Sequence, residues 1–135
     1  MCANDCAPMI DEQPHRSYPR SMSDCLFCKI IEGSIPAKFV HQDDLCVAFR
    51  DVNPQAPMHV LVVPRRHLAT LNDVADADAP LLGHLVVVAA KIAAAEGHAE
   101  AGWRTVVNVN RGAGQTVFHL HVHVLGGRPF GWPPG

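Results

Sequence analysis

The sequence predicts a single α+β domain in which a five-stranded antiparallel sheet packs against one long helix. Segments that read as strands occur at 37–41, 45–50, 58–63, 103–109 and 117–125, and in the last of them histidine and apolar residues alternate. An apolar stretch with helical character separates the third of these segments from the fourth. The short connections between the first two and the last two strands favour an antiparallel meander, which the helix crosses between strands three and four.

The composition fits one domain with a sizeable core, since 48% of the 135 residues are hydrophobic. A formal net charge of -2 provides no broad basic surface for nucleic acid, so an anionic ligand must be held locally. The apolar run 80–95 is interrupted by Gly83, His84 and Lys91, and the N-terminus lacks a secretory signal pattern. We therefore expect no membrane span and a cytoplasmic location.

Residues 1–22 are polar, contain three prolines and lack hydrophobic periodicity. We expect a disordered or loosely attached tail there, preceding a domain at 23–135. Cys2 and Cys6 belong to this tail, and Met22 at its end raises the hypothesis of a second translation start. An odd total of five cysteines without a secretory signal argues against a disulfide framework.

The first organised element is a short helix that Ser23 or Asp24 can cap and that Gly33 is positioned to end. The strands at 37–41 and 45–50 follow, and the polar residues between them predict a hairpin.

A loop determined by its prolines, 51–57, leads into the third strand, 58–63. The long helix then begins at Asp78, with Pro80 in its first turn, and ends at Gly97. Its core-facing side is predicted to consist of Leu81, Leu82, Leu85, Val86, Ala89, Ile92 and Ala93. We interpret His41, His84 and His98 as ordinary histidines without a ligand role.

Three histidines alternate with apolar residues in the last predicted strand. On a strand His119, His121 and His123 point to one face, about 6.6 Å apart, while the opposite face suits a core. Solvation alone explains three such imidazoles poorly. The residues allow two interpretations: a three-histidine metal site, or a nucleophilic histidine whose neighbours fix its tautomer.

The loop before these histidines, 108–116, contains glycines whose backbone N–H groups can bind an anion. Beside imidazoles, such a loop fits phosphoryl or nucleotidyl transfer. Asp51, after the second strand, can accept hydrogen bonds from sugar hydroxyls or can simply form a turn. His59, in the third strand, can contact the histidine strand only if the two strands are neighbours.

Cys25 and Cys28 form a closely spaced thiol pair with three interpretations: incidental cysteines at a helix start, a redox couple, or half of a zinc site. A zinc ion would need two further ligands, for which His67 and one of the three alternating histidines are available. We favour structural zinc, and a redox role ranks last because no thioredoxin-like βαβ pattern follows.

The segment His119–Leu125 resembles the histidine triad motif, in which histidine and apolar residues alternate. Further segments resemble the histidine triad nucleotide-binding (HINT) branch of that superfamily: Phe27-Cys28-Lys29-Ile30-Ile31, Ile35-Pro36-Ala37-Lys38, Asp51-Val52-Asn53-Pro54-Gln55-Ala56-Pro57, His59, Leu82-Gly83-His84-Leu85 and Trp132-Pro133-Pro134-Gly135. The similarity covers the chain from Ser23 to its end.

This resemblance implies a homodimer in which two five-stranded antiparallel sheets join, with a nucleotide site on each protomer. It implies cleavage of the P–N bond of purine nucleoside 5′-phosphoramidates such as adenosine phosphoramidate, and often the hydrolysis of aminoacyl-adenylates as well. Purine nucleotides of the AMP or GMP type would be bound, and the chemistry requires no cofactor.

By the same resemblance, His121 is the nucleophile that attacks the α-phosphorus, with one ring nitrogen held as N–H by a backbone carbonyl. His123 or His119 would protonate the leaving amine, and His59 completes the catalytic histidines. The implied nucleotide site comprises Phe27, Ile35 and Phe49 at the base, Asp51 and Val52 at the ribose, and Asn108, Gly114, Gln115, Thr116, His121 and His123 at the phosphate. Thr116 replaces the family's usual serine and retains the hydroxyl.

Relatives with Cys-x-x-Cys at this position tend to bind zinc through the two cysteines, a histidine after the third strand and the first histidine of the triad. Here those residues would be Cys25, Cys28, His67 and His119. The HINT proteins that are otherwise most similar often lack the thiols. If His119 ligates zinc, its role becomes structural.

Two other functions remain open on the sequence. One is a dinucleoside polyphosphate hydrolase of the same superfamily, against which the Trp-Pro-Pro-Gly ending speaks. The other is a non-enzymatic nucleotide-sensing or scaffold dimer.

Overall fold

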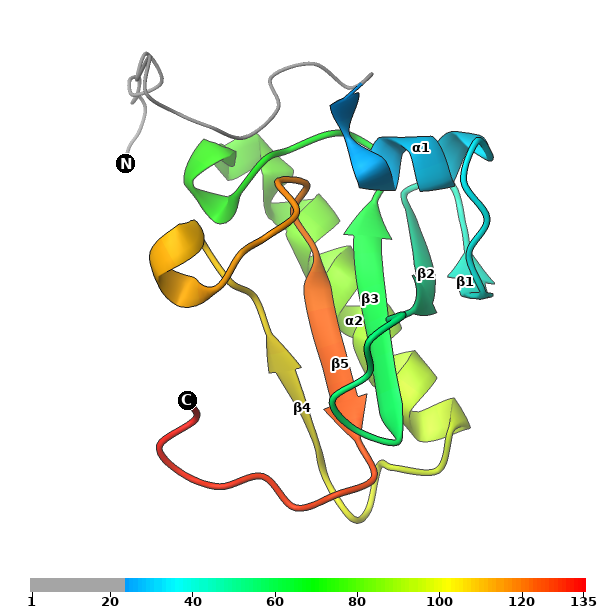
Figure 1. Cartoon of the computed structure of the whole chain (residues 1–135), viewed down its shortest axis with the longest axis vertical. Coiled ribbons are helices and arrows are strands. Elements are labelled where there is room, and N and C mark those ends of the chain that lie inside the picture. Colours follow the sequence, from blue (N-terminus) through cyan, green and yellow to red (C-terminus); the bar gives the residue numbers. More distant parts are fainter. Residues whose placement is uncertain (1–23) are drawn as a thin grey trace.

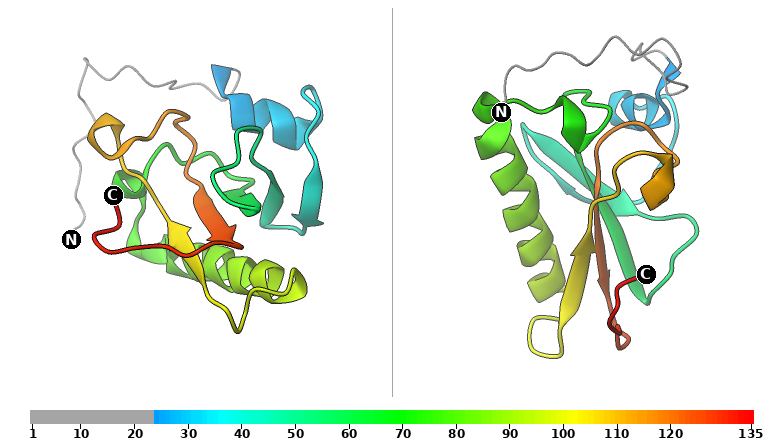
Figure 2. Two further views of the ribbon diagram at one scale, coloured as in Figure 1. Left: turned by 60° about the horizontal axis from the view of Figure 1, so that its bottom comes forward. Right: turned by 90° about the vertical axis from the view of Figure 1, so that its left-hand side faces the viewer.

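A computed structural model describes residues 24–135, which form a five-stranded antiparallel sheet with a long helix across one face (Figures 1 and 2). The predicted tail, with Cys2, Cys6 and Met22, lies outside the described residues. The main elements are α1 Leu26–Glu32, β1 Phe39–Gln42, β2 Cys46–Arg50, β3 Met58–Pro64, α2 Ala79–Ala95, β4 Trp103–Val106 and β5 Val122–Gly126. Three short 3₁₀ turns, Leu71–Asp73, Asp76–Asp78 and Arg111–Ala113, lie in the connections.

The strand order is β1-β2-β3-β5-β4, and every neighbouring pair is antiparallel. The α+β class and the helical crossover are therefore confirmed. A continuous meander is wrong, because α2 carries the chain to the far edge of the sheet and β5 then returns between β3 and β4. This insertion makes β3 and β5 neighbours, which places His59 and His123 on adjacent strands.

Helix α1 begins one residue later than the predicted caps allow. The N-cap is Cys25, whose Sγ accepts a hydrogen bond from the backbone N–H of Cys28 at 3.4 Å. Asp24 precedes the cap, and Ser23 lies outside the described residues. Gly33 ends the helix as predicted, in the left-handed conformation (φ 93°), with its N–H donating to the carbonyl of Ile30.

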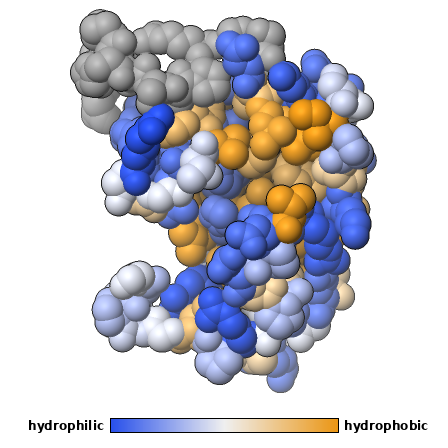
Figure 3. Space-filling model, viewed as in Figure 1, coloured by the Kyte–Doolittle hydropathy of each residue, from blue (hydrophilic) through white to orange (hydrophobic). Residues whose placement is uncertain are grey.

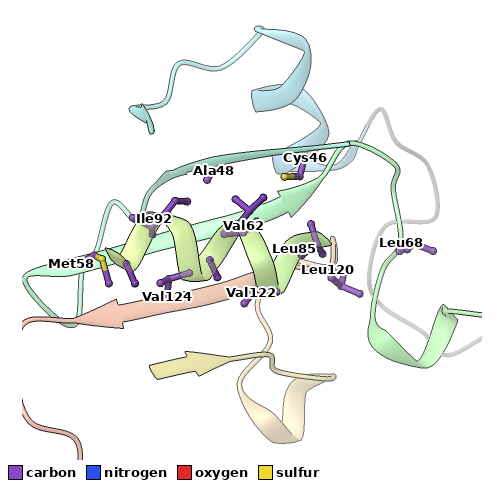
Figure 4. Close-up of a cluster of buried hydrophobic side chains, with 14 residues drawn as sticks. Cys46, Ala48, Met58, Val62, Leu68, Leu85, Ile92, Leu120, Val122 and Val124 are labelled. Carbon is purple, nitrogen blue, oxygen red and sulfur yellow. The ribbon is translucent and has the colours of Figure 1, made fainter. Parts of the chain in front are cut away.

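Strands β2 and β3 are buried on both faces, and alternate residues belong to two separate cores. One core lies between the sheet and α2 and includes Ala48, Met58, Val62, Val122 and Val124 (Figure 4). The second lies on the opposite face under α1 and includes Phe27, Phe49, Leu61 and Val63. The two-residue period of a strand therefore divides the molecule into a structural side, under α2, and a side that faces α1.

Helix α2 packs on the sheet through Leu85, Val88, Ala89, Ile92 and Ala93. Val86 was predicted on this side but is 51% exposed, because Val88 continues the stripe that Leu85 begins at helical spacing. By length and mean hydropathy (1.5) the helical stretch Asp76–Ala95 could cross a membrane, although the interruptions in its sequence led us to expect otherwise. In this fold 33% of the most apolar 18-residue window of the stretch is buried inside the protein.

Both C-terminal strands are shorter than predicted, since β4 ends at Val106 and β5 begins at Val122. The residues just before β5 leave the ladder: the N–H of Leu120 donates to the carbonyl of Leu68, in the segment after β3, at 2.6 Å. Only His123 of the three histidines therefore lies in a strand. The predicted separation of faces still holds, because Leu120, Val122 and Val124 are buried in the α2 core.

Candidate active site

The three alternating histidines lie on the α1 side of the sheet, but they divide between two clusters. His121 and His123 are neighbours, with ring centroids 5.0 Å apart. His119 is fully buried and turns to the other cluster, where its ring lies 4.9 Å from that of His67. A single three-histidine metal site is therefore wrong for this chain, and the alternative, a histidine flanked by partners that fix its tautomer, agrees with the geometry.

The tautomer of His121 is fixed by the backbone. Its Nδ1 lies 2.7 Å from the carbonyl oxygen of His119, which can only accept, so Nδ1 carries the proton. The predicted hydrogen bond to a backbone carbonyl is thus confirmed. The lone pair of His121 is consequently on Nε2. Burial lowers the pKa of His121, so that the neutral, nucleophilic form predominates at neutral pH.

A second chain of hydrogen bonds determines the tautomers of His59 and His123. The backbone N–H of Gln55 donates to Nδ1 of His59 at 2.9 Å, so the neutral imidazole of His59 carries its proton on Nε2. That nitrogen lies 2.9 Å from Nδ1 of His123 and 3.4 Å from the Asp51 carboxylate. When His59 donates to Nδ1 of His123, the proton of neutral His123 is on Nε2, where it can be given to a ligand.

Burial keeps this histidine cluster uncharged. The pKa of His123 is lowered to about 4 by burial and then by the neighbouring imidazoles of His121 and His59. The pKa of His59 is also lowered by burial, which the carboxylate of Asp51 opposes. A neutral imidazole is the form that can attack phosphorus or accept a proton.

An apolar wall adjoins His121. The ring of Phe27, from α1, lies 5.1 Å from that of His121 and 5.4 Å from that of Phe49, both in edge-to-face orientation. Ile35 packs against the same core. Figure 3 shows hydrophobic residues gathered on this face beside α1, with hydrophilic residues around them. The three residues expected at a purine base thus belong to one cluster, in which Phe27 adjoins His121.

The loop between β2 and β3 brings the expected ribose residues to the same face. One oxygen of Asp51 accepts the N–H of Asn53 at 2.8 Å, so the carboxylate forms the predicted turn. The second oxygen faces His59 and retains acceptor capacity for a ligand. Val52 is fully exposed at the tip of this loop.

The residues expected at the phosphate lie in the β4–β5 loop, where Asn108 is half-buried and Thr116 is exposed. Gly114 adopts the left-handed conformation (φ 93°) that closes the turn after Arg111–Ala113. Gln115 is buried, and its amide accepts from the N–H of Asn110 and donates to the carbonyls of Ala69 and Val117. In this arrangement the side chain of Gln115 shapes the loop, and the phosphate contact expected of the Gln115 and Thr116 region stays a prediction.

The second cluster is the predicted metal set of Cys25, Cys28, His67 and His119, whose ligand atoms all lie within 4.8 Å of one another. Nδ1 of His119 is 3.3 Å and 3.5 Å from the two sulfurs and 3.2 Å from Nδ1 of His67. Tetrahedral zinc with ordinary bond lengths separates its ligand atoms by about 3.3–3.7 Å. The donor set and its spacing therefore fit zinc.

The hydrogen bonds around the cluster also orient it for a metal. Nε2 of His119 donates to the carbonyl of Pro64 at 2.8 Å, which leaves the lone pair of Nδ1 facing the sulfurs. Burial lowers the pKa of His67 and, together with Cys25, raises the pKa of Cys28 to about 12. A bound metal would therefore have to displace the thiol proton of Cys28.

A further polar cluster, which the sequence did not indicate, joins β1, β2 and α2. The imidazoles of His41 and His84 each lie 2.7 Å from one oxygen of Asp43, whose other oxygen accepts the N–H groups of Leu45 and Cys46. The distance of 2.7 Å is that of a charge-assisted hydrogen bond and is shorter than the spacing of ligands around zinc. We assign this cluster to stability.

Comparison with known proteins identifies the family. The HIT domain model matches residues 32–130. The chain is 54% identical over 112 residues to an uncharacterized HIT-like protein of Synechococcus elongatus, covering 83% of this chain and 97% of the relative. It is 52% identical over 106 residues to the purine nucleoside phosphoramidase of Escherichia coli K12, covering 78% of this chain and 89% of the relative.

Solved structures agree with the sequence relatives. The crystal structure of a HIT family hydrolase from Legionella pneumophila matches with a TM-score of 0.82 at 54% identity, covering 83% of this chain and all of that one. A histidine triad protein from Clostridium difficile matches with a TM-score of 0.77 at 44% identity, covering 80% and 94%. With its fold, its histidines and its relatives in agreement, the chain belongs to the HIT domain family.

Proposed function

We propose that this protein hydrolyses the P–N bond of purine nucleoside 5′-phosphoramidates through a nucleotidyl-histidine intermediate. The observation that carries the proposal is His121: its Nδ1 is held as N–H by the carbonyl of His119, which leaves the lone pair on Nε2, and its ring lies 5.1 Å from that of Phe27. The E. coli relative named purine nucleoside phosphoramidase supports this substrate class.

In the first displacement, Nε2 of His121 donates its electron pair to the α-phosphorus, and the P–N bond breaks. The leaving amine takes a proton from Nε2 of His123, the nitrogen that the His59 hydrogen bond leaves protonated. His123 gains a second ring proton when the anionic phosphate binds beside it, so this transfer returns His123 to its neutral form. Asp51 accepts hydrogen bonds from the ribose hydroxyls, and the β4–β5 loop presents N–H groups to the phosphate oxygens.

In the second displacement, water attacks the phosphorus of nucleotidyl-His121 and gives a proton to His123. The nucleoside monophosphate leaves, and His121 returns to its neutral state. No step in this scheme needs a metal, since the imidazole of His121 supplies the nucleophile and that of His123 the proton transfer.

Mass spectrometry after rapid quenching of a reaction with adenosine phosphoramidate tests this mechanism. We expect an adenylyl adduct on His121 and loss of both adduct and turnover in His121→Ala. An adduct on another residue, or turnover without any adduct, would contradict it. Turnover of diadenosine polyphosphate in preference to the phosphoramidate would instead favour the hydrolase of dinucleoside polyphosphates.

We also propose a structural zinc ion held by Cys25, Cys28, His67 and His119. The support is the convergence of their ligand atoms at spacings that suit a tetrahedral ion. Bound there, zinc would supply fixed geometry to α1 and to the segment that carries His121, without touching substrate.

Metal analysis of the purified protein tests the zinc site. We expect about one zinc per chain and its loss in Cys28→Ala, a variant that leaves the Cys25 cap of α1 in place. Cys46→Ala is the matched control, because Cys46 is equally buried but lies outside the four ligands. Full zinc content in Cys28→Ala would contradict the assignment.

The protein is further proposed to act as a homodimer. Val86 and Val87 are each 51% exposed on the outer face of α2, and β4 is an edge strand of the sheet. An apolar helix face beside an open sheet edge is a surface that a second copy can cover.

A further inference from the structure

We propose that Arg128 is a positioning residue for the catalytic histidines, acting through the backbone of Gln55. Arg128 lies in the C-terminal segment, outside the residues expected to contact the nucleotide. Its Nε donates to the carbonyl of Gln55 at 2.8 Å, and the N–H of that same residue donates to Nδ1 of His59. The catalytic consequence rests on the function proposed above, whereas the hydrogen-bonded chain stands by itself.

The guanidinium of Arg128 is itself held in place. It lies over the ring of Phe130, 4.4 Å from the centroid, and a second nitrogen donates to the carbonyl of Pro129 at 3.1 Å. Arg104, from β4, lies 5.1 Å from the same ring and donates to the carbonyl of Gly131. Two guanidinium groups therefore contact one aromatic ring, but in the described residues only Arg128 is bonded to the loop that leads to His59.

Close packing brings the C-terminal segment to the loop between β2 and β3. A Cβ built on Gly127 would lie 2.7 Å from Cβ of Pro57, and one on Gly126 would lie 2.9 Å from the end of Met58. Gly127 also has a φ of 96°, which side-chain-bearing residues rarely adopt. The double glycine after β5 is thus the place where the C-terminal segment can approach residues 55–58.

A chain of hydrogen bonds runs from the C-terminal segment to His123, the proposed proton donor. Arg128 fixes the carbonyl side of Gln55, the N–H of Gln55 keeps Nδ1 of His59 unprotonated, and Nε2–H of His59 then faces Nδ1 of His123. This order leaves the proton of His123 on Nε2. If Gln55 moved, His59 could adopt the other tautomer and place a lone pair against His123, which would orient the donor wrongly.

The direct test is the ¹⁵N spectrum of the imidazole nitrogens in the full chain without substrate, recorded for Arg128→Gln and Arg104→Gln. The second variant is the matched control, since it removes the other guanidinium from Phe130 but breaks no bond to Gln55. We expect Arg128→Gln to shift His59 from the Nε2–H tautomer toward a mixture, and Arg104→Gln to keep the wild-type tautomer. Arg128→Lys, which can still donate to the carbonyl of Gln55, should keep the wild-type tautomer of His59.

Single-turnover kinetics with adenosine phosphoramidate provide the second readout. We expect the rate of nucleotidyl transfer in Arg128→Gln to fall at least about tenfold, part of the 10²–10⁴ that positioned proton transfer supplies, with less change in KM. An unchanged His59 tautomer, or equal changes in both arginine variants, would overturn the proposal. Because the spectra need no turnover, they decide it even if the wild-type protein fails to cleave this substrate.

Discussion

At the scale of single residues, the chemistry of the site depends on which ring nitrogen of each histidine carries the proton. A backbone carbonyl decides this for His121 and a backbone N–H decides it for His59. His121 therefore carries its proton on Nδ1, whereas neutral His59 carries its proton on Nε2. His119 uses its own pair of nitrogens differently, with one bonded to Pro64 and the other turned to the cysteines. His119, His121 and His123 are equally spaced in the sequence, but the fold gives each of them different hydrogen-bond partners.

The lowered pKa of His121 predicts how activity depends on pH. Burial favours the neutral imidazole, so the nucleophilic form persists as pH falls below about 6.5, the ordinary histidine value, and is lost only at the lower pKa of the folded protein. We expect the acid limb of kcat/KM to lie clearly below pH 6.5, measured against the rate without enzyme. An acid limb at or above that value would contradict the buried, neutral nucleophile.

At the scale of elements, polar contacts connect parts that hydrophobic packing alone does not orient. Cys25 both caps α1 and faces His119, so the start of that helix is tied to the segment before β5. Asp43 connects the β1–β2 turn to α2 through His84. Each connection crosses between elements far apart in the sequence, which fixes the helices relative to the sheet.

Replacing Asp43 tests the second connection. Asp43→Asn should lower the free energy of unfolding by about 1–3 kcal/mol, because it weakens charge-assisted hydrogen bonds from two histidines and two backbone groups. Asp44→Asn, at the exposed neighbouring position, should change it by less than about 0.5 kcal/mol. Urea unfolding of both variants decides, and equal effects would assign the stability to turn conformation alone.

The same carboxyl predicts an acid effect on stability. Burial opposes its ionisation, but hydrogen bonds from His41, His84 and two backbone N–H groups hold the pKa of Asp43 well below its usual range. The folded state therefore binds the proton more weakly than the unfolded state does. The stabilisation should be complete above about pH 4 and be lost as pH falls below it, and Asp43→Asn should show a smaller loss over that range.

At the scale of the whole molecule, the sheet separates two tasks. Helix α2 covers the face that holds the main core, while the opposite face, with α1 and the long loops, carries the histidines (Figure 2). The exposed valines of α2 lie away from the candidate active site, so a second copy could cover them without closing it.

Light scattering of Val87→Glu tests the proposed dimer. We expect the wild type to have the mass of two chains and the variant to shift toward one, because a buried carboxylate opposes the apolar contact. Leu45→Glu is the control, since Leu45 is 49% exposed on the β1–β2 turn, away from α2. A wild type with the mass of one chain, or a variant that remains dimeric, would contradict this surface.

Local pattern predicted much of the fold. The strands, the long helix and its end near Gly97, and the Gly33 cap follow from periodicity and backbone preferences that neighbouring residues share. The local pattern failed where segments distant in the sequence compete for the same hydrogen-bonding groups. Leu120 bonds to Leu68 instead of to a strand, which shortens β5, and Cys25 provides the cap expected from Ser23 or Asp24.

The sequence by itself determined which side chains could carry chemistry, because alternation and motif spacing select residue types and faces. The tertiary structure alone decided how His119, His121 and His123 divide their work, that β5 lies between β3 and β4, and that Gln55 and Arg128 support His59. The physical reason is that the deciding partners are mostly backbone N–H and carbonyl groups. Almost every residue has them, so only the folded arrangement selects which ones meet a histidine.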